Sequence, residues 1–119
     1  MELIDLKNEI LTSVKAMQKG RTLLSSAGET LARAISDYDK QLAVTMIQLR
    51  NGVTMNLEGN EIENPPTTIT EKIAKGICYE SKFAVEMAQV SYKVVCLKLD
   101  ALKVEVSSLQ SLLKYFEVV

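Results

Sequence analysis

Few residues in this chain of 119 could carry out chemistry. It contains no histidine, which removes the commonest general base and a frequent metal ligand. Cys78 and Cys96 lie about five turns apart if they share a helix, too far for an intrachain disulfide, and neither has an evident base. Two distant cysteines cannot form a zinc site, and no glycine-rich phosphate loop is present. We therefore predict a non-enzymatic protein without cofactor or metal.

Three carboxylates and three arginines are the remaining candidates for ligand binding. Glu58, Glu61 and Glu63 lack the spacing and central glycine of a calcium loop, which favours a solvated acidic loop. Guanidinium groups bind phosphates well, and pockets often form where the subunits of an oligomer meet. An alternative function is therefore the sequestration of a small molecule such as a nucleotide signal. Its candidate anion contacts are the only arginines of the chain, Arg21, Arg33 and Arg50.

Charge and hydropathy limit the other classes of partner. The net charge is -1, so the overall balance does not attract nucleic acid or an anionic membrane. Six lysines between Lys72 and Lys103 keep nucleic-acid binding as a second alternative, but Glu80, Glu86 and Asp100 are interleaved with them. No apolar run approaches the roughly 18 residues of a membrane span, and the first residues lack the basic start of a signal peptide. We predict a cytoplasmic protein with reduced thiols.

The C-terminal half has the periodicity of one long helix, from about Thr70 to Glu117. Apolar residues recur at steps of three and four, interrupted only by Ser81, which is the pattern of a coiled-coil contact. This first row consists of Cys78, Val85, Ala88, Tyr92, Val95, Leu99, Leu102, Val106, Leu109, Leu113 and Phe116.

A second apolar row lies nearly opposite the first on the same helix. It consists of Phe83, Met87, Val90, Val94, Leu97, Ala101 and Val104. A helix with two apolar faces must be covered twice, and one partner helix cannot do that. We predict that the second row is an interface with further subunits or with another protein.

The N-terminal half, from about Leu3 to Leu49, also has a helical period. Its large column is Ile10, Met17, Leu24, Leu31 and Tyr38, and its small column is Ser13, Gly20, Ala27 and Ala34. Small residues between large ones let two helices approach closely. Polar residues on the opposite face, such as Lys15 and Arg33, predict a helix that is apolar on one side only. The apolar register continues through both Gly20 and Gly28, which favours one helix; two helices broken near Gly20–Ser26, with a capping box at Ser26 and Glu29, are the alternative.

The segment between about 51 and 69 lacks helical periodicity. Asn51-Gly52 is a helix stop, and alternation followed by Gly59-Asn60 indicates a short β-hairpin. Thr68 and Glu71 have the spacing of a capping box at the start of the next helix. The predicted fold is a single all-α domain, 1–119: a long antiparallel helical hairpin with arms at about 3–50 and 70–117, assembling into a helical-bundle oligomer.

The segment from Tyr92 to Phe116, with its heptads of valine and leucine, resembles the C-terminal helix of small helical-hairpin proteins encoded in phage and prophage genomes. The chain is also similar in size and plan to a family of secreted helical hairpins, but it lacks their Trp-x-Gly turn. The phage resemblance implies an accessory protein that serves recombination or antagonises a host defence complex. Together with the second row, it predicts a homo-oligomer that acts by binding another protein.

Overall fold

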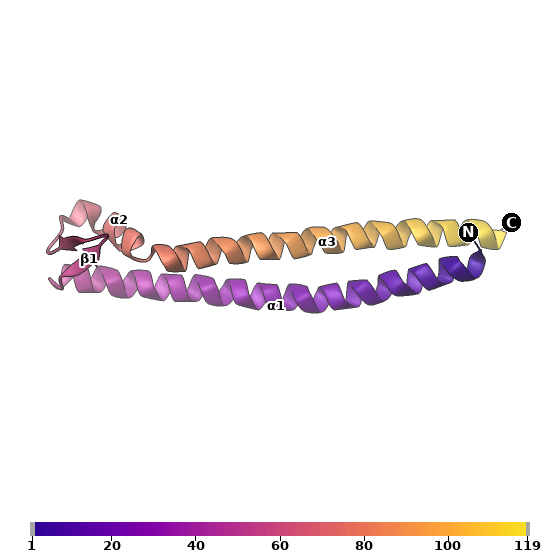
Figure 1. Cartoon of the computed structure of the whole chain (residues 1–119), viewed down its shortest axis with the longest axis horizontal. Helices are drawn as coiled ribbons and strands as arrows, with labels where there is room; N and C mark the ends of the chain where they lie inside the picture. The colour runs from indigo at the N-terminus through magenta and orange to yellow at the C-terminus, as the bar shows by residue number, and fades with distance from the viewer. Residues whose placement is uncertain (1, 119) are drawn as a thin grey trace. The chain divides into compact units, whose positions relative to one another are not determined.

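The computed structural model describes residues 2–118. Along the chain come α1 (Leu3–Arg50), β1 (Met55–Leu57), β2 (Asn60–Ile62), α2 (Thr67–Ile77) and α3 (Tyr79–Val118). Helices α1 and α3 run antiparallel, and the small β-hairpin and α2 connect them (Figure 1). This confirms the predicted antiparallel helical hairpin, and its assembly into an oligomer stays a prediction. The chain divides into two compact units, a terminal unit of Met1–Glu29 with Val90–Val119 and a connector unit of Thr30–Gln89.

Helix α1 is uninterrupted at both of its glycines, which confirms the prediction of one helix rather than two. Gly20 lies against α3, where a Cβ atom built on it would be 2.6 Å from Cδ2 of Leu99. A Cβ atom on Gly28 would be 3.5 Å from Cε2 of Tyr92. Both glycines therefore lie on the side of α1 that contacts α3. The alternative capping box at Ser26 is wrong, because Ser26 lies inside the helix.

The second arm differs from the single helix expected from about Thr70 to Glu117. It begins earlier, at Thr67, and is divided between α2 and α3 at Cys78, whose ψ of 22° lies outside the helical range. Gly76, two residues before the break, lies under β1, where an added Cβ atom would be 3.2 Å from Leu57 Cδ2. Helix α2 thus packs on the β-hairpin, a contact between segments that the apolar period of the arm does not reveal.

The predicted capping box of Thr68 and Glu71 is wrong. Pro66 occupies the N-cap position of α2, and no side chain caps the helix. The Pro66 carbonyl instead accepts hydrogen bonds from the Ile69 backbone N–H and from the Thr70 hydroxyl, each at 3.0 Å. The fixed φ of proline orders the chain at the helix start without a side-chain cap.

Of the two turns predicted in the connection, the helix stop at Gly52 is present, and the hairpin turn lies one residue earlier than predicted, at Glu58-Gly59 rather than Gly59-Asn60. After Arg50, Gly52 adopts a φ of 80° and its N–H donates to the Leu49 carbonyl at 3.2 Å, which ends α1. The strands pair antiparallel, with Leu57 opposite Asn60. Glu58 and Gly59 between them both have positive φ, as a two-residue turn of type I′ requires. The hairpin prediction is confirmed.

Each unit buries side chains of both α1 and α3, and the connector unit also buries side chains of α2. In the terminal unit Leu6 and Ser13 of α1 are buried with Leu99 and Val106 of α3. The buried side chains of the connector unit are Thr45, Leu49, Thr70, Ala74, Cys78, Val85 and Ala88. The first row is buried or half-buried along its length except at its last member, Phe116, which is exposed. The large and small columns of α1 are likewise buried or half-buried.

The candidate protein-binding face of helix α3

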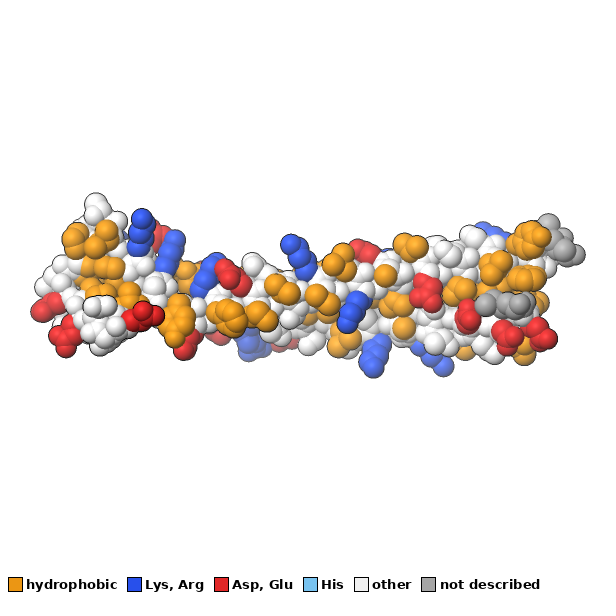
Figure 2. All heavy atoms as spheres, turned by 45° about the horizontal axis from the view of Figure 1, so that its top comes forward, with side chains coloured by type: hydrophobic (Ala, Val, Ile, Leu, Met, Phe, Trp, Pro, Cys, Tyr) orange, Lys and Arg blue, Asp and Glu red, His pale blue; other side chains and the backbone are white. Residues whose placement is uncertain are grey.

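All seven side chains of the second row are exposed. Phe83 and Met87 belong to the connector unit, and the other five, from Val90 to Val104, belong to the terminal unit. Leu97 and Leu99 show the contrast between the two faces of α3, because 66% of Leu97 is exposed but only 5% of Leu99. Figure 2 shows hydrophobic side chains at intervals on the surface, among charged ones. Helix α1 covers one face of α3 and leaves the other apolar and open.

The exposed row is longer than the seven residues predicted. Leu112 and Tyr115 of the terminal unit are also exposed, and they continue the same spacing after Ser108. Tyr79, four residues before Phe83, is exposed at the other end of α3. The same steps of three and four, continued along the sequence in both directions, would have predicted that Tyr79, Leu112 and Tyr115 lie on this face. The second row therefore extends at both ends into aromatic side chains.

The outer face of α1 is less polar than predicted. Ile4, Leu11 and Leu23 are exposed in the terminal unit, and Val44 and Ile47 in the connector unit. The prediction of a strictly one-sided helix is therefore wrong. Ile4 and Leu11 are one heptad apart, and Val44 and Ile47 are three residues apart, but most of α1 separates these two short groups. Apolar residues scattered on a surface are normal. They do not form a second continuous row like that of α3.

The three arginines are not assembled into one site. Arg21 is in the terminal unit, whereas Arg33 and Arg50 are in the connector unit, and all three are exposed. Arg33 and Arg50 lie on the same helix, and at 1.5 Å per residue they are roughly 26 Å apart along its axis. Two guanidinium groups of one chain at that separation cannot hold the same phosphate, and the predicted pocket between subunits stays a prediction.

The other titratable residues show local contacts rather than a ligand site. Lys75 Nζ pairs with Glu71 Oε1 at 3.2 Å, and Lys82 Nζ lies 5.4 Å from the centre of the Tyr38 ring. These contacts hold two lysines of the candidate nucleic-acid surface against the protein itself. Within residues 2–118, no group of three acidic, cysteine or histidine side chains could hold a metal ion. The three loop glutamates, from Glu58 to Glu63, are exposed.

The two cysteines have different surroundings. Cys78 is buried, and its Sγ lies 3.4 Å from the hydroxyl of Thr45. Cys96 is half-buried on α3.

At the start of α3, Tyr79 donates a hydrogen bond to Glu80 Oε1 at 3.2 Å. This bond, together with the negative charge of Glu80, raises the pKa of Tyr79 above its ordinary value.

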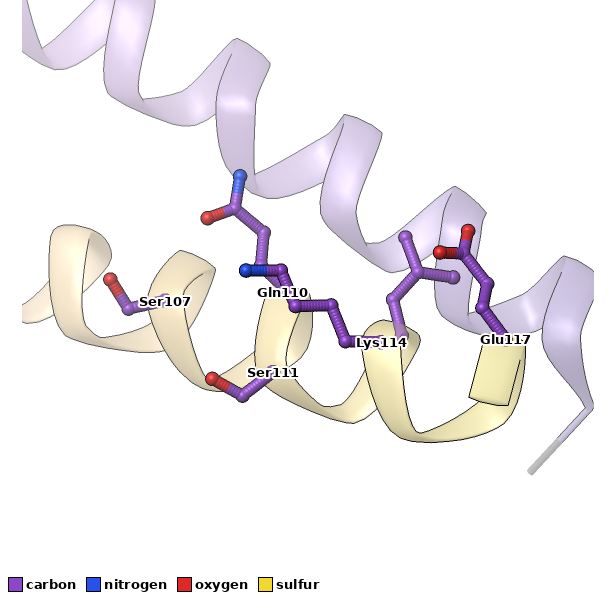
Figure 3. Close-up of a pocket in the computed structure, with 6 residues that line it drawn as sticks. Ser107, Gln110, Ser111, Lys114 and Glu117 are labelled. Carbon is purple, nitrogen blue, oxygen red and sulfur yellow. The ribbon is translucent and has the colours of Figure 1, made fainter. Parts of the chain in front are cut away.

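One open hollow of about 510 Å³ lies along the last turns of α3. It is lined by Ser107, Gln110, Ser111, Leu113, Lys114 and Glu117. Figure 3 shows that these side chains all come from the same helix. A ligand there would be held by one helix only, whereas small-molecule sites usually enclose most of their ligand. The exposed apolar face of α3 remains the strongest candidate for a functional site.

Comparison of the chain with protein-family models, with curated proteins and with solved structures gives no significant match. No helix in the described part of the chain is both long enough and apolar enough to cross a membrane.

Proposed function

We propose that the protein is a non-enzymatic homo-oligomer that acts by binding another protein. The observation that supports this is the continuous exposure of the second row on α3, opposite a row that α1 already covers. A solvent-facing helix normally carries charged and polar residues on its outer side. Burial of half-exposed valine and leucine side chains contributes on the order of 1 kcal/mol each before the costs of association. The row therefore provides a driving force for assembly.

The biological setting of the proposal comes from the sequence. The resemblance of Tyr92–Phe116 to phage hairpin proteins suggests an accessory factor that serves recombination or antagonises a host defence complex. The two free thiols suit the reducing cytoplasm. Self-association would occupy part of the second row, and its aromatic ends, such as Phe83 and Tyr115, are suited to contact the protein partner.

The experiment is a comparison of two faces of the same helix. The double variant Val94→Glu with Leu97→Glu places like charges on the second row and should reduce the mass measured by light scattering while helical circular dichroism is kept. The matched control, Leu99→Glu, places a charge in the buried row and should unfold the chain, because an unpaired charge is costly to bury.

Two results would count against the proposal. A wild-type chain that remains a 13.2 kDa monomer at micromolar concentration would exclude self-association. If instead the Val94 and Leu97 charges unfold the protein as Leu99→Glu does, the second row belongs to an internal core rather than to an interface.

A further inference from the structure

The polar residues beside the second row favour a particular orientation and register if two copies of α3 pair through that row. In the terminal unit, Lys93 and Asp100 lie along one flank of the row and are separated by one heptad. Ser91, Lys98 and Glu105 lie along the other flank at the same spacing. All five are exposed. Neither Lys93 nor Asp100 forms an ion pair with another residue that the structure describes. In helical assemblies such flanking residues determine the orientation of the partners.

A parallel pairing of two α3 helices in register is disfavoured by these charges. In that arrangement a residue on one flank meets the opposite-flank residue five positions later in the second copy. Lys93 would then lie beside Lys98 of the second copy, and Asp100 beside Glu105 of the second copy. Both contacts join like charges and both occur twice, because the arrangement is symmetric.

In an antiparallel pairing, each flank of the second row meets the same flank of the second copy, so these contacts between like charges do not form. When Val94 of one copy packs against Leu97 of the other, Lys93 faces Asp100 of the second copy, and Asp100 faces its Lys93. Val90 then packs against Ala101 of the second copy, so the apolar contacts continue on both sides of the axis. On the other flank Lys98 faces the uncharged Ser91 of the second copy.

Adjacent antiparallel registers are less favourable. Sliding one copy by a heptad in one direction places Asp100 opposite Asp100 of the second copy. Sliding it in the other direction places Lys93 opposite Lys93 of the second copy. Of these three registers, only the one centred between Val94 and Leu97 gives two attractive pairs at Lys93 and Asp100.

We infer that the occupant of the second row in the terminal unit is a second copy of this chain, paired antiparallel through α3 about a twofold axis between Val94 and Leu97, with Lys93 of each copy against Asp100 of the other. The inference rests on the proposed self-association and adds its partner surface, orientation and register. It leaves the first row free to pack on α1 in each copy, because the two rows lie on opposite faces of α3.

The test is a charge exchange measured by analytical ultracentrifugation at low salt. Lys93→Glu places a carboxylate against Asp100 of the second copy, and Asp100→Lys places an ammonium group against its Lys93. Each variant alone should therefore dimerise on the order of 10-fold more weakly than wild type. Mixing the two single variants should restore the affinity in a heterodimer, because one of its two contacts is then the exchanged pair, the other is the wild-type pair, and both join opposite charges. The double variant should also regain near wild-type affinity, whereas Lys98→Glu should have little effect.

The outcomes separate this inference from the proposed function. Recovery in the mixture and in the double variant, lost in high salt, supports the antiparallel register. Dimers that persist unchanged in all charge variants, or a double variant that does not recover, overturn the register but leave self-association standing. A wild-type chain that does not associate overturns both. Circular dichroism of every variant shows whether a variant that no longer dimerises has kept its helical fold or has unfolded.

Discussion

The two glycines of α1 provide a sharp test of the packing in the terminal unit. In an otherwise unstrained helix, glycine to alanine stabilises by about 1 kcal/mol. At Gly20 the new Cβ atom would lie 2.6 Å from Leu99 Cδ2 and 3.2 Å from Leu99 Cγ, whereas carbon atoms prefer about 3.5–4.0 Å. Rotation about the Cβ–Cγ bond of Leu99 would move Cδ2 away but would leave Cγ in place, 3.2 Å from the new Cβ atom. Overpacking of this kind costs about 1–3 kcal/mol, so Gly20→Ala should destabilise by up to about 2 kcal/mol.

Gly28→Ala is the matched control in the same helix and the same unit. Its Cβ atom would lie 3.5 Å from Tyr92 Cε2, an ordinary contact, so this variant should gain about 1 kcal/mol. Urea unfolding followed by circular dichroism at one fixed protein concentration measures both, because association would otherwise change the apparent stability. In a Leu99→Ala background Gly20→Ala should become stabilising. Equal stabilisation by both alanines in the wild-type chain would refute the close approach of Gly20 and Leu99.

Two smaller predictions concern single side chains. Cys96 should react with a thiol reagent faster than the buried Cys78, so that Cys96→Ala removes the fast phase; a fast phase that survives in Cys96→Ala would contradict the burial of Cys78. Glu80→Gln should lower the pKa of Tyr79 toward its ordinary value, because the carboxylate that accepts its hydrogen bond and opposes its ionisation is gone. Ultraviolet titration, with Tyr79→Phe to identify the signal, measures that shift, and an unchanged titration would exclude the contact.

The proposed interface was readable from the sequence because helix geometry fixes which side chains share a face. Steps of three and four assign Leu97 and Leu99 to opposite sides of α3, and the structure exposes the first and buries the second. The same rule, followed further, would have added Tyr79, Leu112 and Tyr115. The flanking charges at Lys93 and Asp100 are also placed by this periodicity alone.

The candidate anion site could be judged in part in the same way. Arg33 and Arg50 lie on one helix whether or not the arm breaks near Gly20–Ser26, so the helical rise already separates them. Only the place of Arg21 depended on the continuity of the helix. In the structure, Arg33 and Arg50 lie far apart along one helix.

By itself, the sequence determined the antiparallel hairpin, the continuity of α1, the turns at Gly52 and Gly59 and the row that α1 leaves open. These features depend on local backbone preferences and on helical periodicity, which neighbouring residues specify. Only the tertiary structure decided that the second arm divides at Cys78 and that α2 starts at Thr67, after Pro66, without a side-chain cap. Gly76 lies against Leu57 of the β-hairpin, a contact between residues distant in the chain. Such contacts depend on how segments pack, and packing can override the helical preference of a single segment.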